Sequence, residues 1–175
     1  MTRILVAGIG NIFKGDDAFG VEVAQRLRWR SLPPGVEVID FGIRGIDLTY
    51  ALLEGYSSAV LIDAAQRGGQ PGTVYVIEPD QLTGDPAPED LLMSPHDLDP
   101  ARVLRVATAL GANCDHIILV ACEPLTFGDD LEGYMGLSAP VAAAVDAAVG
   151  IVEQVLQDLL APAVSDQVPV NSPAD

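Results

Sequence analysis

The chain has 175 residues, 49% of them hydrophobic, so it is long enough to bury a core and too apolar to be disordered. Its 25 acidic and nine basic residues give a net charge of −16. This charge makes nucleic acids and membranes poor partners, whereas a metal ion or a basic protein surface would be attracted.

Short buried runs alternate with amphipathic segments along the chain, which is typical of an α/β sandwich around a mainly parallel sheet. The spacing predicts strands at 4–8, 36–40, 59–63, 73–78 and 116–122, and helices at 18–30, 46–54, 98–110 and 139–160. Only about ten residues separate the third and fourth strands, too few for a helical crossover, so the fourth strand should run antiparallel. Proline and acidic residues predict a long loop at 79–95. We expect a single domain over residues 1–160 and a disordered tail at 161–175.

Two cysteines, Cys114 and Cys122, are expected to pack as small apolar side chains rather than to form a disulfide or bind a metal. The N-terminus has no charged segment followed by a long apolar core, and we find no window of about 18 apolar residues. We therefore expect a soluble, cytoplasmic protein.

A glycine-rich loop follows the first predicted strand. Gly8 and Gly10 begin it like a dinucleotide-binding fingerprint, but Phe13 stands where the third glycine is needed. Asp16 and Asp17 follow, where a pyrophosphate would need positive charge or free N–H groups. The loop therefore favours a metal ion or a polarised water over a phosphate, and either aspartate is well placed to cap the next helix. A nucleotide-binding Rossmann-like domain stays open as an alternative.

Acidic residues stand at the ends of three predicted strands: Asp17 follows the first, Asp40 ends the second and Asp63 ends the third. Because the carboxyl ends of parallel strands meet at one edge of a sheet, these carboxylates should gather there. His96, at the end of the long loop, is the natural nitrogen donor, and carboxylates with one imidazole suit a divalent ion such as zinc or nickel. His116 begins the fifth strand, so we expect it at the opposite edge in a structural role.

The segment at 8–20 resembles the opening signature of the nickel–iron hydrogenase maturation endopeptidases, and the resemblance covers about residues 1–160. It implies a three-layer α/β/α sandwich with a mixed, mainly parallel five-stranded sheet that contains one antiparallel strand. It also implies that the chain removes a C-terminal peptide from its partner, the nickel-loaded large-subunit precursor of a nickel–iron hydrogenase. The resemblance continues in Asp40-Phe41-Gly42-Ile43-Arg44-Gly45, Leu61-Ile62-Asp63-Ala64, Ser94-Pro95-His96, Glu123-Pro124 and Gly136-Leu137-Ser138.

The same resemblance implies that Asp17, Asp63 and His96 contact a metal ion. Either the enzyme holds a catalytic metal that polarises the scissile carbonyl, or the three residues recognise nickel already bound in the substrate. We favour substrate nickel, because carboxylate and imidazole donors alone need not retain a metal tightly. Zinc or cadmium could then occupy the site in vitro.

Further residues at this edge are candidates for catalysis and substrate binding. Asp40 is a candidate general base or a residue that supports the metal ligands, and a turn cap is an equal alternative. Gly42 and Gly45 would permit close approach of a substrate peptide, and Arg44 would meet an acidic substrate group, pair with Asp40 or lie on the surface. We expect a monomer. A non-catalytic chaperone that holds the precursor is the alternative function.

Overall fold

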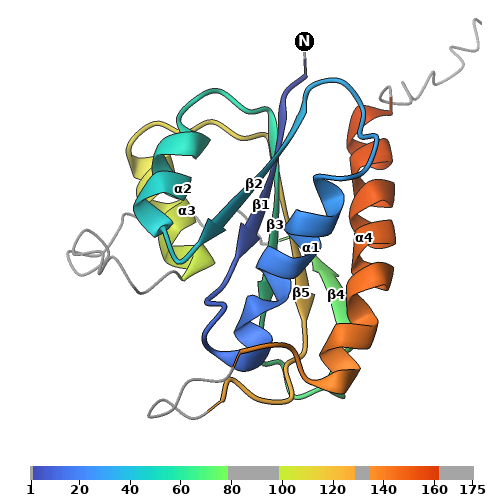
Figure 1. The fold of residues 1–175 in the computed structure, drawn as a ribbon. Helices are drawn as coiled ribbons and strands as arrows, with labels where there is room; N and C mark the ends of the chain where they lie inside the picture. Colours follow the sequence, from blue (N-terminus) through green and yellow to red (C-terminus); the bar gives the residue numbers. More distant parts are fainter. Residues whose placement is uncertain (1, 79–98, 129–134, 162–175) are drawn as a thin grey trace, which may run out of the picture.

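The computed structural model describes residues 2–78, 99–128 and 135–161, so the predicted loop at 79–95 and nearly all of the predicted tail lie outside the described residues. Its centre is a five-stranded sheet with the order β2-β1-β3-β5-β4 (Figure 1). The four strands β2, β1, β3 and β5 run parallel, and β4 pairs with β5 antiparallel, which confirms the prediction from the short connection before β4. The strands are β1 (Ile4–Ile9), β2 (Val36–Gly42), β3 (Ser58–Ala64), β4 (Val74–Ile77) and β5 (His116–Cys122).

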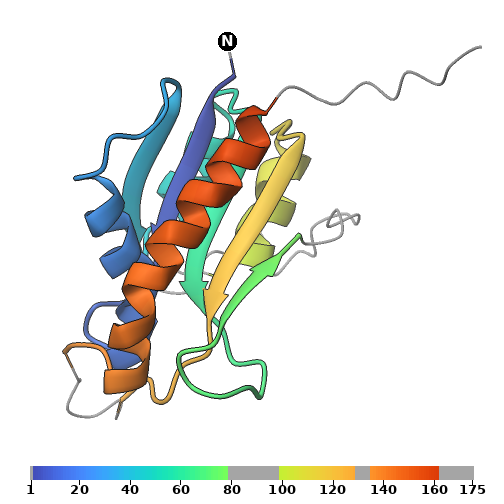
Figure 2. The ribbon, with the colours of Figure 1, turned by 90° about the vertical axis from the view of Figure 1, so that its right-hand side faces the viewer.

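Helices cover both faces of the sheet and confirm the three-layer sandwich (Figure 1, Figure 2). Residues of β1 alternate between the two cores: Ile4 and Val6 pack with α1 and α4, whereas Leu5 and Ala7 pack with α2 and α3. Because β1 is buried on both faces, its sequence is continuously apolar. The helices are α1 (Phe19–Leu27), α2 (Gly45–Leu52), α3 (Pro100–Ala109) and α4 (Ala139–Leu160).

Glycines allow α1 to lie directly against the sheet. A Cβ on Gly20, in the first turn of α1, would overlap the carbonyl oxygens of Ile9 and Ile62. A Cβ on Gly8 would lie only 2.5 Å from the Cβ of Ala24. Gly8 and Gly20 thus provide the close helix–strand contact that a third fingerprint glycine would otherwise supply, so Phe13 is free to differ.

The long helix α4 corrects one expectation from the sequence. It is long and apolar enough, by length and composition, to cross a membrane, with a mean hydropathy of 1.5 in its most apolar window. In the fold, however, its apolar stripe packs on the sheet, where Val145, Val149 and Val152 are buried. We therefore read α4 as a core helix.

The two cysteines pack as apolar side chains, as predicted. Cys122 is buried in the core beneath α1 and α4, and Cys114 is half-buried against the opposite core. Burial raises the pKa of the Cys122 thiol to about 11, and the charges of Asp16 and Glu123 add to this. A thiol of this kind is a poor nucleophile.

Candidate active site

Asp17 lies in a 3-10 turn, Gly15–Ala18, between β1 and α1. Its Oδ2 accepts a hydrogen bond from the backbone N–H of Asn11 at 2.8 Å. Gly10 allows the loop to approach Asp17 this closely, since it has a φ of 136° and a Cβ there would overlap the carbonyl of Asp17. The glycine loop therefore folds around Asp17 and holds its half-buried carboxylate at the end of β1.

Asp63 stands near the end of β3, and the charge of Asp17 acts on its carboxylate. Burial raises the pKa of Asp63 well above its usual range, against a hydrogen bond from Ala64, and the charges of Asp17 and Asp99 raise it further. Burial also raises the pKa of Asp17, against the hydrogen bond from Asn11 and the charge of Lys14. Neighbouring carboxylates that resist ionisation favour a bound cation or a shared proton.

Asp16 has a different role from Asp17, and the prediction that one of them caps α1 is wrong. The N-cap of α1 is Ala18, with no side-chain cap. The fully buried carboxylate of Asp16 instead accepts hydrogen bonds from the N–H groups of Leu125, Thr126 and Ser138 and from the Ser138 hydroxyl, at 2.7–3.0 Å. These donors lie 109–122 residues away, so no local pattern could have indicated them.

Asp40 reaches the predicted edge of the sheet but faces away from Asp63. Gly8 of β1 pairs with Asp40 on one side and with Ile62 on the other. Residues at the same level of a parallel sheet point to the same face, and Ile62 packs in the core beneath α1 and α4. Strand alternation therefore directs Asp40 to the α1 side and Asp63 to the α2–α3 side.

The segment after β2 is organised by Arg44. Its guanidinium donates to the carbonyl oxygens of Asp40 and Phe41 and forms an ion pair with Asp47 at 3.3 Å. Arg44 thus pairs with Asp47 and contacts Asp40 only through its backbone, while its side chain stays 57% exposed. Gly42 has a φ of 55°, which suits glycine, and Gly45 is buried as the first residue of α2.

A third acidic residue, Asp99, lies near Asp63 and was not predicted. Its side chain caps α3 by accepting the N–H of Ala101 at 3.0 Å, and the helix begins at Pro100. An Asp-Pro pair before a helical segment is a signal that could have identified it. His96, the predicted nitrogen ligand, lies outside the described residues. Within the described ranges, no group of three or more His, Cys, Asp or Glu side chains could hold a metal ion.

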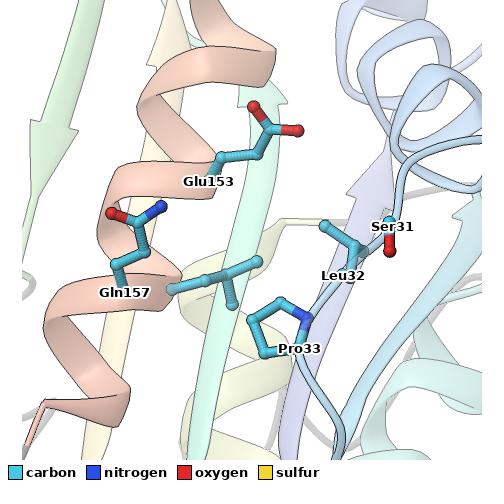
Figure 3. Close-up of a pocket in the computed structure, with 6 residues that line it drawn as sticks. Ser31, Leu32, Pro33, Glu153 and Gln157 are labelled. Carbon is cyan, nitrogen blue, oxygen red and sulfur yellow. The ribbon is translucent and has the colours of Figure 1, made fainter.

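The opposite edge of the sheet contains none of these carboxylates. His116 begins β5 there and is exposed, where it was expected. A cavity of about 450 Å³ lies at this edge, between the segment before β2 and the last turns of α4 (Figure 3). Its lining residues are Ser31, Leu32, Pro33, Glu153, Leu156 and Gln157.

Several known proteins are similar to this chain in sequence or in fold. Residues 21–155 match the hydrogenase maturation protease family. The chain is 33% identical to a hydrogenase expression/formation protein of Rhizobium leguminosarum bv. viciae, over 89% of this chain and 74% of that one. It is equally identical to the hydrogenase 2 maturation protease of Escherichia coli, over 90% of both chains. The solution structure of an endopeptidase from Escherichia coli superposes with a TM-score of 0.72 at 31% identity, covering 90% of this chain and 94% of that one.

Proposed function

Because this chain belongs to the hydrogenase maturation protease family, we propose that it removes a C-terminal peptide from the large-subunit precursor of a nickel–iron hydrogenase. Family membership makes it a peptidase, so a chaperone without catalytic activity and a dinucleotide-binding domain are no longer needed as alternatives. The observation that carries the proposal is the Asp17–Asp63 pair at the carboxyl ends of β1 and β3.

The two carboxylates fit a role in recognising the nickel that the precursor carries. Burial raises the pKa of both carboxyl groups, and the charge of Asp17 adds to this at Asp63, so a divalent cation would favour their ionised forms. Carboxylate oxygens and an imidazole nitrogen form a donor set that nickel accepts, and His96 would supply the nitrogen. The metal in this scheme is part of the substrate, and zinc or cadmium would be substitutes in vitro.

The remaining predicted residues have supporting roles in the proposal. Arg44 stabilises the segment after β2 through its hydrogen bonds to the backbone. Its side chain is partly exposed, so it could also contact an acidic group of the substrate. Gly42 has no side chain and a φ that suits glycine, so a peptide could pass close to the backbone there. Asp40 is the candidate base on the α1 side of the sheet. Gly45 is the first residue of α2 and ends the segment after β2.

The source of the metal is tested with two forms of the precursor. Purified chain is incubated with nickel-loaded and with nickel-free large-subunit precursor, and the C-terminus of each product is determined by mass spectrometry. We expect cleavage of the loaded form only. Efficient cutting of the nickel-free form would contradict recognition of substrate nickel, and no cutting of either form would contradict the proposed function.

His96 is tested against the only other histidine in the chain. His96→Ala should abolish processing, because the site loses its nitrogen donor, whereas His116→Ala at the opposite edge should process normally. The mobility shift of the precursor on a gel gives the readout. Equal processing by the two variants would remove His96 from the site.

A further inference from the structure

Exposed apolar side chains surround the edge of the sheet where Asp17 lies. Ile12 and Phe13 precede the 3-10 turn and are 41% and 58% exposed. Leu125 follows β5 and Met135 precedes α4, with exposures of 57% and 68%. Single exposed apolar residues are common on protein surfaces, but four beside one candidate site are typical of a surface that binds a partner. We refer to these four residues as the apolar rim.

Hydrogen bonds of Asp16 join the loop that carries Ile12 and Phe13 to the segments that carry Leu125 and Met135. Its carboxylate accepts the N–H of Leu125 at 2.8 Å and that of Ser138, three residues after Met135, at 2.7 Å. Its own N–H donates to the carbonyl of Thr126 at 3.1 Å. The loop after β1 therefore lies beside the segments that precede α4, as both ribbon views show (Figure 1, Figure 2).

The composition of the apolar rim is that of an interface centre. Aromatic residues and methionine are enriched at the centres of protein interfaces, and charged residues are depleted there. A flexible methionine also adapts well to a partner surface.

The apolar rim lies beside Asp17, and this position indicates which partner would cover it. Asp17 directly follows Asp16, so a scissile bond that reaches Asp17 brings the surrounding protein surface onto these loops. We propose that the apolar rim docks the folded body of the large-subunit precursor, next to the bond that is cut. This inference rests on the proposed function and adds a docking surface to it.

The test compares substitutions in the apolar rim with one at a distant exposed residue. The variants are Phe13→Ser, Met135→Ser and the double change Phe13→Ser/Leu125→Ser. The control is Trp29→Ser, since Trp29 is 91% exposed and follows α1, at the opposite edge of the sheet. Kinetics are measured with nickel-loaded precursor, and circular dichroism verifies that each variant is folded.

We expect the double variant to raise KM about tenfold and to leave kcat within about twofold, because docking energy is lost and the catalytic groups are unchanged. The single changes should give smaller increases in KM, and Trp29→Ser should give none. If the double variant does not fold, Phe13→Ser and Met135→Ser decide the question.

Two results would overturn the docking surface without touching the proposed function. The first is wild-type KM in every folded variant while the wild-type chain still cuts the precursor. The second is a wild-type dimer in sedimentation that the substitutions abolish without a change in KM, which would assign the apolar rim to a second copy of this chain. If the wild-type chain does not cut the precursor at all, the proposed function itself fails.

Discussion

Asp16 and Asp17 are adjacent carboxylates with different environments. Asp16 is fully buried and accepts four hydrogen bonds from the loops after β5. Asp17 is half-buried, accepts one hydrogen bond from Asn11 and lies close enough to Asp63 to raise its pKa. The first carboxylate therefore joins two loops, whereas the second is the one that we propose to meet the substrate metal.

Removing the Asp16 carboxylate should destabilise the protein strongly. Asp16→Ala leaves the N–H groups of Leu125, Thr126 and Ser138 without their acceptor, and we expect the free energy of unfolding to fall by about 3 kcal/mol or more. Urea denaturation measures the change. Asp47→Ala, which removes an exposed ion pair with Arg44, should cost less than about 1 kcal/mol. Equal midpoints for the two variants would contradict the role of Asp16.

Glu123 should make stability depend on pH. Burial opposes its ionisation, but hydrogen bonds from the backbone of Arg67 and Gly68 and from the Tyr75 hydroxyl outweigh this and lower the pKa of Glu123 below its ordinary value of 4.5. A lowered pKa in the folded state adds stability above pH 4.5, and this stability is lost as the pH falls through the folded-state pKa.

The corresponding experiment compares wild type with Glu123→Gln. The wild type should be more stable than the variant at about pH 7. The difference between their melting temperatures should decrease steadily below about pH 4.5. Thermal unfolding across this range gives the measurement. The control is Glu54→Gln, since Glu54 is exposed and this substitution removes the same charge from the surface. A difference in melting temperature that stays constant with pH would show that the ionised form of Glu123 is not the stabilising one.

At the scale of elements, the contact between β1 and α1 determines where Asp17 lies. α1 can approach the sheet only because Gly8 and Gly20 have no side chains, and the 3-10 turn that carries Asp17 leads directly into α1. A shift of α1 would move Asp17 relative to Asp63. Helix position and site geometry are therefore linked through two glycines.

Two glycine-to-alanine changes should have opposite effects on stability. Gly20→Ala would force a Cβ into the carbonyl oxygens of Ile9 and Ile62, and we expect a loss of about 1–3 kcal/mol. Gly150→Ala in α4 adds a Cβ into open space, where alanine favours the helix by about 0.5–1 kcal/mol. Thermal denaturation distinguishes them. A neutral Gly20→Ala would mean that α1 adjusts without cost.

At the scale of the whole molecule, the dominant property is the net charge of −16. Such an excess keeps a protein soluble but destabilises the compact state through self-repulsion. The described ion pairs, such as Arg30 with Glu153 at 3.7 Å, lie on the surface and contribute little. Stability should therefore depend on the ionic strength of the solution.

Raising sodium chloride from about 10 mM to about 200 mM should increase the melting temperature, because the Debye length falls and repulsion between carboxylates is screened. Choline chloride at the same concentration should give the same increase, since screening does not depend on the identity of the cation. A rise with sodium alone would indicate specific binding instead, and a fall in melting temperature would contradict the argument.

The sequence alone determined the α/β class, the antiparallel β4 and the position of Asp17 and Asp63 at strand ends. These follow from local properties: hydrophobic periodicity indicates each element, and a connection of about ten residues is too short for a parallel crossover. His96 stays a prediction, because it lies outside the described residues. The glycine loop folds around an acid, Asp17, as the sequence predicted.

Only the tertiary structure decided which of the two adjacent aspartates is structural, and on which side of the sheet each strand-end acid points. The donors to Asp16 come from residues 109–122 positions away, and the facing of Asp40 depends on its register with Gly8. Local sequence does not encode contacts of this kind, because they exist only once distant strands and loops have been packed together.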